Sequence, residues 1–397
     1  MELPDGRQRA NLESEMTTSV EVGPLHVLVA DDRSDVLEAL RLLLKGAGHL
    51  ADLVDSPQGL LRAAGASDYD LILMDLNYAR DTTSGSEGLD LLAKLHSHEN
   101  PPPVIVMTAW GNIDVAVEAM RRGAVDFVQK PWDNQRLLGM VEKQAREGAL
   151  RRRAESRART EIEIARNVQQ RLFPPPSSHL ASTAYAGRCA PAREVGGDYY
   201  DFFDLAPGVL GFVLADVSGK GIAAALLMAN LQGCFRSHAA IALDSPRSLL
   251  CAVNRLFFDS TPPEQFATLF FGQYDEGTRR LRYVNCGHPA PIVLAGGGSG
   301  IEKLGTTATV LGAFREWDCE ERSVQLAPGD TLVAYSDGVT EAGIEDGEEF
   351  GEERLLEVLR GCGHGPIDDV IGKLIEAALG ADPVQGDDIT VIALRAG

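Results

Sequence analysis

The stretch LILMD (Leu71–Asp75) places four apolar residues directly before a carboxylate. Four consecutive apolar residues predict a β-strand that is covered on both faces, as in a parallel sheet. A buried strand can end on an acid only if that acid reaches water, a metal ion or a partner at the edge of the sheet. The end of this strand is therefore a candidate functional position.

The residues around this strand repeat the same pattern. Between about Leu25 and Asn134, short apolar segments such as HVLVA (His26–Ala30) alternate with helical patterns. This alternation predicts a doubly wound α/β domain, over residues 25–132, with a parallel five-stranded sheet. In such a sheet, ligands bind at the carboxyl ends of the strands.

The composition of the whole chain limits the classes of function. The chain has 397 residues, of which 44% are hydrophobic and 24% charged, and its formal net charge is −21. This length predicts two or three domains, and the acidic balance argues against nucleic acid as the main ligand. No apolar run approaches the ~18 residues that span a bilayer. Residues 1–24 predict a disordered leader, and six scattered cysteines without a CxxC pair argue against zinc and predict a reduced, cytoplasmic protein.

Residues 133–173 are expected to form a helical linker, because they are rich in Arg, Glu and Ala and lack proline. Apolar side chains recur there at helical spacings of three and four, at Ala158, Ile162, Ala165, Val168 and Leu172. Two interpretations remain open. The helix is either a solvated connector or one strand of a homodimeric coiled coil, whose weak, Ala-rich seam a modest signal could repack.

After the proline-rich segment Pro174–Ser178, the pattern changes. Residues 174–397 contain many short apolar strands with helical segments between groups of them. This arrangement predicts an α+β domain with stacked β-sheets and helices on the outside.

In the first domain, polar side chains end four successive strands, namely Asp31 with Asp32, Asp75, Thr108 and Lys130. Each alone has an ordinary explanation, such as a helix cap or a solvated lysine. Together they meet at one edge of the sheet, where three carboxylates would repel one another unless a hard cation such as Mg²⁺ lay between them. A hydroxyl and an ammonium group would then neutralise phosphoryl oxygens. The set predicts a carboxylate nucleophile that forms an acyl phosphate.

Over roughly Leu25–Gln144, these features resemble the receiver domain of bacterial response regulators. The resemblance implies that Asp75 accepts a phosphoryl group from a sensor histidine kinase. It also implies a Mg²⁺ site formed by Asp31, Asp32, Asp75 and the main-chain carbonyl of Asn77. Thr108 and Lys130 would contact the phosphoryl group, with a cis Lys130–Pro131 bond. Phe127 matches the aromatic residue of the switch. The sequence departs from the family in one place. The polar segment LNYARDTTSGSEG (Leu76–Gly88) replaces a short Met-Pro loop and bears on kinase docking and phosphoryl lifetime.

The second domain places acids in glycine-flanked turns, at Asp198, Asp216, Asp337, Asp387 and Asp388. One Asp beside a glycine is common hairpin chemistry. Asp216 and Asp337 differ, because each follows or interrupts an apolar strand, where an unpaired carboxylate would be costly. If four or five such acids converge, they can hold two divalent metals, which can activate a shared water and clamp a phosphate.

These motifs, in order, resemble the type 2C metal-dependent protein phosphatases, in the bacterial SpoIIE/RsbU-like branch, over about Glu161–Arg395. The resemblance implies two Mn²⁺ or Mg²⁺ ions that Asp216 bridges. The main-chain carbonyl of Val217, Asp337, Asp387 and Asp388 would be further ligands. Asp198 would bind either directly or through a metal-bound water. The position of Asp388, directly after Asp387, often carries Asn in relatives. Gly197 stands where the eukaryotic type has Glu. Arg193 is either a substrate-phosphate contact or an ordinary surface arginine, and His288 is expected to be structural.

The sequence thus leads to the hypothesis of a response regulator with a phosphoserine/phosphothreonine protein phosphatase as its output. By resemblance, the substrate is a phosphorylated anti-sigma-factor antagonist, a small STAS-domain protein. Phosphorylation of Asp75 is expected to repack the linker helix and to alter the order of the metal site. The alternatives are a non-catalytic protein that sequesters a partner and a regulator that acts on nucleic acid. The full set of carboxylates argues against the first, and the acidic balance argues against the second.

Overall fold

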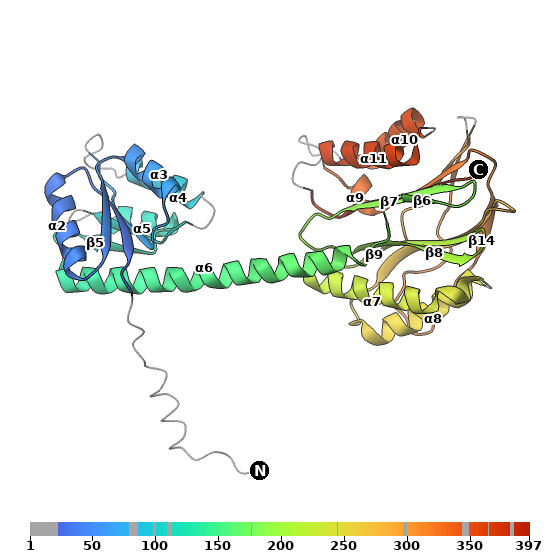
Figure 1. Ribbon diagram of the computed structural model, residues 1–397, viewed down its shortest axis with the longest axis horizontal. Coiled ribbons are helices and arrows are strands. Elements are labelled where there is room, and N and C mark those ends of the chain that lie inside the picture. Colours follow the sequence, from blue (N-terminus) through green and yellow to red (C-terminus); the bar gives the residue numbers. More distant parts are fainter. Residues whose placement is uncertain are drawn as a thin grey trace, which may run out of the picture. The chain divides into compact units, whose positions relative to one another are not determined.

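The fold is described from a computed structural model of the chain (Figure 1). The described residues are 23–78, 86–97, 101–108, 113–175, 177–243, 245–296, 300–343, 349–363, 365–381 and 385–397. The expected leader lies outside them up to residue 22, as do residues 79–85 of the polar loop after Asp75. The chain divides into two compact units, Met1–Arg159 and Thr160–Gly397. Each unit is described by itself.

The first unit has the doubly wound parallel sheet that the sequence predicts. Its strand order is β2-β1-β3-β4-β5, and all neighbouring strands are parallel. Its elements are β1 (His26–Ala30), α2 (Ser34–Gly46), β2 (Leu50–Val54), α3 (Pro57–Ala66), β3 (Leu71–Asp75), α4 (Ser86–His96), β4 (Val104–Thr108), α5 (Ile113–Arg121), β5 (Asp126–Gln129) and the start of α6 (Asn134–Gln170).

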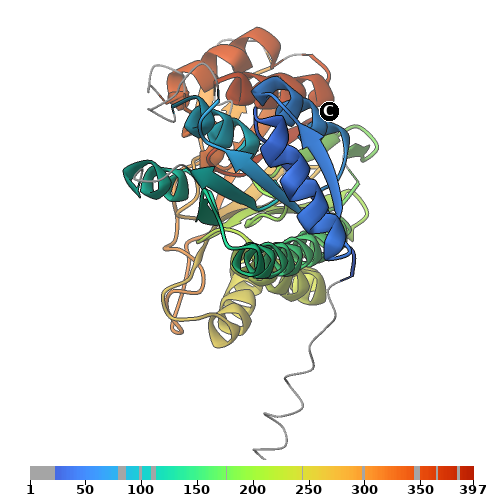
Figure 2. The ribbon, with the colours of Figure 1, turned by 90° about the vertical axis from the view of Figure 1, so that its left-hand side faces the viewer.

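The central strand β3 explains why its sequence is apolar without alternation. Successive side chains of a strand point to opposite faces. Leu71 and Leu73 pack on one face with α2 and the start of α6, while Ile72 and Met74 pack on the other with α3 and α4. Figure 2, which views α6 nearly end-on, shows α2 beside the strands. Because helices cover both faces, Asp75 can reach a ligand only at the end of the strand.

Helix α6 changes character along its length. Its first turns bury Leu137, Val141 and Ala145 against the sheet of the first unit. Farther along, the apolar side chains of Leu150, Ile164 and Val168 are 57%, 58% and 58% exposed. The exposed segment keeps both interpretations of the linker open as hypotheses. None of the helices in the described residues is long and apolar enough to cross a membrane.

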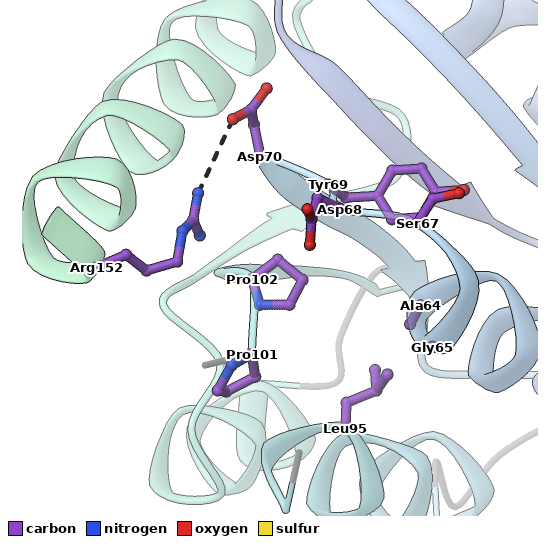
Figure 3. Close-up of a pocket in the computed structure, with 10 residues that line it drawn as sticks. All are labelled: Ala64, Gly65, Ser67, Asp68, Tyr69, Asp70, Leu95, Pro101, Pro102 and Arg152. Carbon is purple, nitrogen blue, oxygen red and sulfur yellow. Dashed lines mark ion pairs between the residues drawn. The ribbon is translucent and has the colours of Figure 1, made fainter. Parts of the chain in front are cut away.

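A hollow of about 720 Å³ lies beside the amino end of β3 in the first unit. Its lining includes Asp68, Asp70 and Pro102, and Arg152 of α6 reaches it from the side (Figure 3). The Arg152 Nη2 atom lies 3.9 Å from Asp70 Oδ1. Because Asp75 is at the other end of the same strand, this hollow is separate from the strand-end acids.

The second unit consists of two antiparallel sheets with helices outside, as the sequence predicts (Figure 1). One sheet has the order β14-β11-β10-β9-β8, and the other has the order β13-β12-β15-β16-β7-β6. Its elements are β6 (Ser177–His179), β7 (Ala184–Ala190), β8 (Asp198–Ala206), β9 (Val209–Val217), α7 (Ile222–His238), η1 (Ala239–Leu243), α8 (Pro246–Ser260), β10 (Ala267–Asp275), β11 (Arg280–Cys286), β12 (Ile292–Leu294), β13 (Ile301–Lys303), β14 (Arg322–Gln325), β15 (Thr331–Tyr335), α9 (Asp337–Thr340), α10 (Gly351–Cys362), α11 (Ile367–Ala381) and β16 (Ile389–Arg395).

Three apolar layers hold this unit together. Phe235 of α7 and Phe257 of α8 are buried with residues of the first sheet. Helices α10 and α11 cover the second sheet. Between the sheets, Phe212 and Phe270 pack with Ile392 of the opposing sheet. This sandwich fixes the ends of strands from both sheets, where the predicted acids lie.

Candidate functional site

The predicted acids of the first unit lie together. Asp31 and Asp32 follow β1, and Asp75 is the last residue of the neighbouring strand β3. One carboxylate oxygen from each of the three lies within 4.8 Å of the others. Asp31 is 0% exposed and Asp75 is 5% exposed. Three crowded carboxylate oxygens of this kind fit a hard divalent cation such as Mg²⁺.

Lys130 balances part of this negative charge. Its Nζ atom lies 2.5 Å from Asp31 Oδ2 and 2.8 Å from Asp75 Oδ2. Burial raises the pKa of Asp75, and the hydrogen bond from Lys130 opposes that shift. The peptide bond between Lys130 and Pro131 is cis. The Asp75 carboxylate is therefore buried and paired with a cation of the kind that can hold phosphoryl oxygens.

The other predicted receiver residues surround this cluster. Thr108 ends β4 and is buried, and its main-chain carbonyl accepts a hydrogen bond from the backbone N–H of Lys130 at 2.8 Å. Asn77 lies two residues after Asp75, and its side-chain oxygen is buried. Phe127 lies on β5 at the surface, where its side chain is 41% exposed. Sequence reasoning missed Tyr78, whose buried hydroxyl has no partner among the described residues.

In the second unit, the antiparallel pairing of β8 and β9 places Asp198 directly opposite Asp216. Asp337 begins α9 just after β15, and Asp387 and Asp388 lie just before β16. Because β15 pairs with β16, these acids come from one end of the second sheet. The two sheets therefore bring the predicted acids to a common region.

Burial and the charges of neighbouring carboxylates raise the pKa values of several of these acids. Burial, and then the charges of Asp337 and Asp387, raise the pKa of Asp216 to about 7. Burial and Asp387 also raise the pKa of Asp337. The pKa of Asp198 is raised well above its usual range by burial and by the charge of Asp216. Carboxylates that oppose one another's ionisation in this way are suited to bind divalent cations.

Asp388 uses its carboxylate differently from its neighbour. Its Oδ1 accepts the backbone N–H of Ala192 at 2.8 Å, and its Oδ2 accepts those of Gly197 at 2.8 Å and Asp198 at 3.4 Å. A Cβ atom at Gly196 would lie 2.1 Å from Asp388 Oδ2, so this close approach requires glycine. The geometry makes Asp388 a brace for the loop that carries Asp198.

The immediate surroundings of Asp198 and Val217 are equally tight. Thr390 Oγ1 donates a hydrogen bond of 2.5 Å to Asp198 Oδ2. A Cβ atom at Gly197 would lie 2.8 Å from the main-chain carbonyl oxygen of Val217. That carbonyl, expected as a metal ligand, thus lies against the glycine that stands where the eukaryotic type has Glu.

Three further residues lie at or near this site. Arg193 lines a small hollow together with Asp216, Lys220 and Asp387. Lys220 was not singled out from the sequence, although it lies only four residues after Asp216. His288 is buried, its Nδ1 lies 2.9 Å from Thr268 Oγ1, and burial lowers its pKa to about 3. It is therefore neutral at physiological pH, in keeping with the structural role expected for it.

The end of α6 also reaches this loop. Gln169 Nε2 donates a hydrogen bond to the carbonyl oxygen of Gly196 at 2.8 Å, and Gln169 Oε1 accepts the N–H of Gly196 at 3.2 Å. Sequence reasoning assigned Gln169 no contact, although it lies within the range Glu161–Arg395 that resembles the phosphatases. The contact joins residues 27 positions apart in the chain, and no local pattern around Gln169 points to it.

Family models match two parts of the chain. Residues 27–142 match the response regulator receiver domain, and residues 206–397 match the stage II sporulation protein E (SpoIIE) model. Asp198 precedes the second range. Protein IcfG of Synechocystis sp. is 30% identical over 265 residues, covering 59% of this chain and 41% of IcfG. Phosphoserine phosphatase RsbU of Bacillus subtilis is 29% identical over 240 residues, covering 60% of this chain and 70% of RsbU.

A solved structure has the same fold as the second unit. The SiaA-PP2C domain of Pseudomonas aeruginosa has a TM-score of 0.54 and 20% sequence identity, and the match covers 61% of this chain and 98% of that domain. This likeness concerns the fold alone.

Proposed function

The chain is a response regulator receiver domain joined to a phosphatase domain of the SpoIIE family, and we propose that phosphorylation of Asp75 controls hydrolysis of a phosphoserine or phosphothreonine protein. The observation that carries the proposal is the convergence of acids from two sheets around Asp216, whose pKa is raised to about 7 by burial and then by the charges of Asp337 and Asp387. The residues that we propose as the metal-binding set are Asp198, Asp216, Asp337, Asp387 and the carbonyl of Val217. Asp388 was expected as a further ligand, and for it we propose the role of a brace instead. When bound there, two Mn²⁺ or Mg²⁺ ions would supply an activated water and charge neutralisation for the phosphate.

The protein's own residues then have separate tasks. Asp216 and Asp387 supply carboxylate oxygens at the mouth of the site, where both line the same small hollow. Asp388 keeps Gly197 and Asp198 in place through backbone hydrogen bonds. Arg193 lines that hollow, and we propose that it contacts the oxygens of the substrate phosphate rather than serving as an ordinary surface arginine. No covalent phosphoenzyme is expected in this domain, because the attacking group is water.

In the receiver domain, the Asp75 carboxylate would attack the phosphorus atom of a phosphohistidine on a sensor kinase. An acyl phosphate forms on Asp75 as the P–N bond to the kinase histidine breaks. Lys130 already contacts Asp75 at 2.8 Å and would pair with the new phosphoryl oxygens. Mg²⁺ held by Asp31, Asp32, Asp75 and the carbonyl of Asn77 would neutralise the remaining charge. Thr108 and Phe127 are the proposed switch residues.

Helix α6 is the proposed route of control. It starts in the receiver domain and ends with Gln169 bonded to both backbone polar groups of Gly196, two residues before Asp198. A change in α6 therefore reaches the loop of a proposed metal ligand through two hydrogen bonds. The exposed apolar side chains of Leu150, Ile164 and Val168 further support pairing of α6 with a second copy.

For the substrate, we propose a phosphorylated STAS-domain anti-sigma-factor antagonist. The support is the similarity to RsbU, which is itself a phosphoserine phosphatase. Dephosphorylation would let such an antagonist capture an anti-sigma kinase and release a sigma factor. The competing proposal, a non-catalytic protein that sequesters the same partner, predicts binding without turnover.

The test is phosphatase turnover on a phosphoserine protein with Mn²⁺, measured on the full chain with and without beryllofluoride and Mg²⁺. We expect turnover to vanish in Asp216→Ala and to respond to beryllofluoride only when Asp75 is present. Equal turnover with and without beryllofluoride would refute control through Asp75. Metal binding without any turnover would favour the sequestering protein.

A further inference from the structure

Lys220 places an ammonium group on a proposed metal ligand. The residue lies in the loop between β9 and α7, and its Nζ atom is 2.8 Å from Asp387 Oδ2 and 2.8 Å from the carbonyl oxygen of Gly386. A carboxylate and a main-chain carbonyl are also the oxygen types that a hard divalent cation takes. The lysine therefore engages Asp387 with the same kind of contact that a metal would make.

The loop holds Lys220 at this position but leaves its side chain able to move. The flanking residues Gly219 and Gly221 have φ angles of +97° and +73°, which other residues adopt only at a cost. The side chain of Lys220 is 49% exposed. An exposed ammonium can exchange a carboxylate for water with little loss of free energy. The backbone thus fixes where the cation is attached, while the ion pair itself is weak enough to open.

The neighbouring charges make this lysine part of the acid cluster. Its charge opposes the rise in the pKa of Asp216 and of Asp337. It also borders a hollow of about 180 Å³ whose lining includes Asp387 and Glu341. In this position the ammonium charge of Lys220 offsets part of the repulsion between the carboxylates, as a bound divalent cation would.

From these contacts we propose that Lys220 is a tethered cation that competes with divalent metal for Asp387. The inference rests on the proposed function in taking Asp387 as a metal ligand. Metal binding then requires the ammonium to leave Asp387 and Gly386, and the cost appears as a weaker apparent metal affinity. Lys220 would accordingly set the metal concentration at which the Asp387 position fills.

The experiment is a Mn²⁺ titration of the full chain, with free Mn²⁺ measured by electron paramagnetic resonance. The variants are Lys220→Met and Lys220→Gln, with Lys303→Met as the matched control. Lys303 has an ion pair in the same domain with Glu352, which is not a proposed metal ligand, so its loss removes the same charge without breaking a contact to those ligands. Because an exposed ion pair has to be broken, we expect the Lys220 variants to bind Mn²⁺ about two- to five-fold more tightly, with no change for the control.

The outcomes separate this inference from the proposed function. Wild-type Mn²⁺ binding that is lost in Asp216→Ala and is unchanged in both Lys220 variants would overturn the competition alone. An equal tightening in the Lys303 control would also overturn it, because the effect would then be one of net charge. If no part of the Mn²⁺ binding depended on Asp216 and Asp387, the metal site itself would be refuted.

Discussion

Removal of the Asp388 carboxylate should destabilise the phosphatase domain even when no metal is bound. In Asp388→Ala, the backbone N–H groups of Ala192 and Gly197 each lose a 2.8 Å hydrogen bond to a charged acceptor, and Asp198 loses a longer one. Gly197 is buried, so water cannot replace the lost partner there without a change in structure.

The size of the effect follows from these contacts. A hydrogen bond to a charged group contributes roughly 1.5–3 kcal/mol, so the two short bonds together contribute about 3–6 kcal/mol. Repulsion works in the other direction, because after burial the neighbouring carboxylates, Asp388 among them, raise the pKa of Asp198 and of Asp216. Relief of this repulsion would return about 1 kcal/mol at the dielectric of a partly exposed site. The net loss is then about 2–5 kcal/mol, or roughly 5–15 °C in the melting temperature of a domain of this size.

The assay is scanning calorimetry of the full chain in excess chelator, in which the receiver transition serves as an internal reference. Asp204→Ala is the matched control, because Asp204 lies on β8 in the same domain and its side chain is exposed. The control should stay within about 0.5 kcal/mol of wild type.

A metal ligand would give the opposite pattern. If Asp388 chiefly held metal, its removal would leave the chelated protein as stable as wild type, or more stable, because only repulsion would be lost. Such a result, together with weaker Mn²⁺ binding, would refute the assignment of Asp388 as a brace.

Four further predictions concern the same domain. Because the pKa of Asp216 is raised to about 7, a proton must leave Asp216 when metal binds below that pH. Mn²⁺ affinity should therefore fall by up to about tenfold per pH unit below pH 7. Calorimetry in buffers of different ionisation enthalpy should detect the released proton. Without metal, the raised pKa favours the folded state at low pH, so the domain should lose stability as pH rises from about 4 to 7. Arg236→Ala leaves the fully buried carboxylate of Asp201 without its guanidinium partner and should lower the free energy of unfolding in urea by about 2–4 kcal/mol. The loss should be smaller at pH 5 than at pH 8, because protonation of Asp201 removes the unpaired charge. An equal loss of stability at both pH values would contradict this reasoning. Gln169→Ala should change turnover and Mn²⁺ affinity while the receiver still accepts beryllofluoride, and an unchanged Mn²⁺ affinity would argue against α6 as the route of control.

The receiver fold and the place of its acids could be predicted from the sequence for a simple geometric reason. In a parallel sheet every strand ends at the same edge, so residues that follow successive strands must meet. Asp31 and Asp75 lie on neighbouring strands and indeed share a cluster with Asp32. The sandwich was also predictable, because strands grouped apart from helices pack as layers.

The roles of adjacent residues in the phosphatase domain could not be predicted in the same way. Asp387 and Asp388 have the same side chain, and only the direction in which the chain enters β16 decides which one contacts Lys220 and which one braces Gly197. The contacts of Lys220 and Gln169 join residues far apart in sequence, to Gly386 and Gly196 respectively, and local patterns carry no information about such pairs.

The pairing of Asp198 with Asp216 bears on whether a distant homologue can be inferred to be active from its sequence. In an antiparallel hairpin, a slip of one residue turns every following side chain to the other face. A homologue could thus keep every acid and still be inactive, if one residue were gained or lost between Tyr199 and Phe203. Changes of length at the turn after Ala206, where β8 ends beside a bulge, would leave the pairing intact. Whether such a relative works as an enzyme is therefore a question of spacing within the hairpin as much as of which residues it retains.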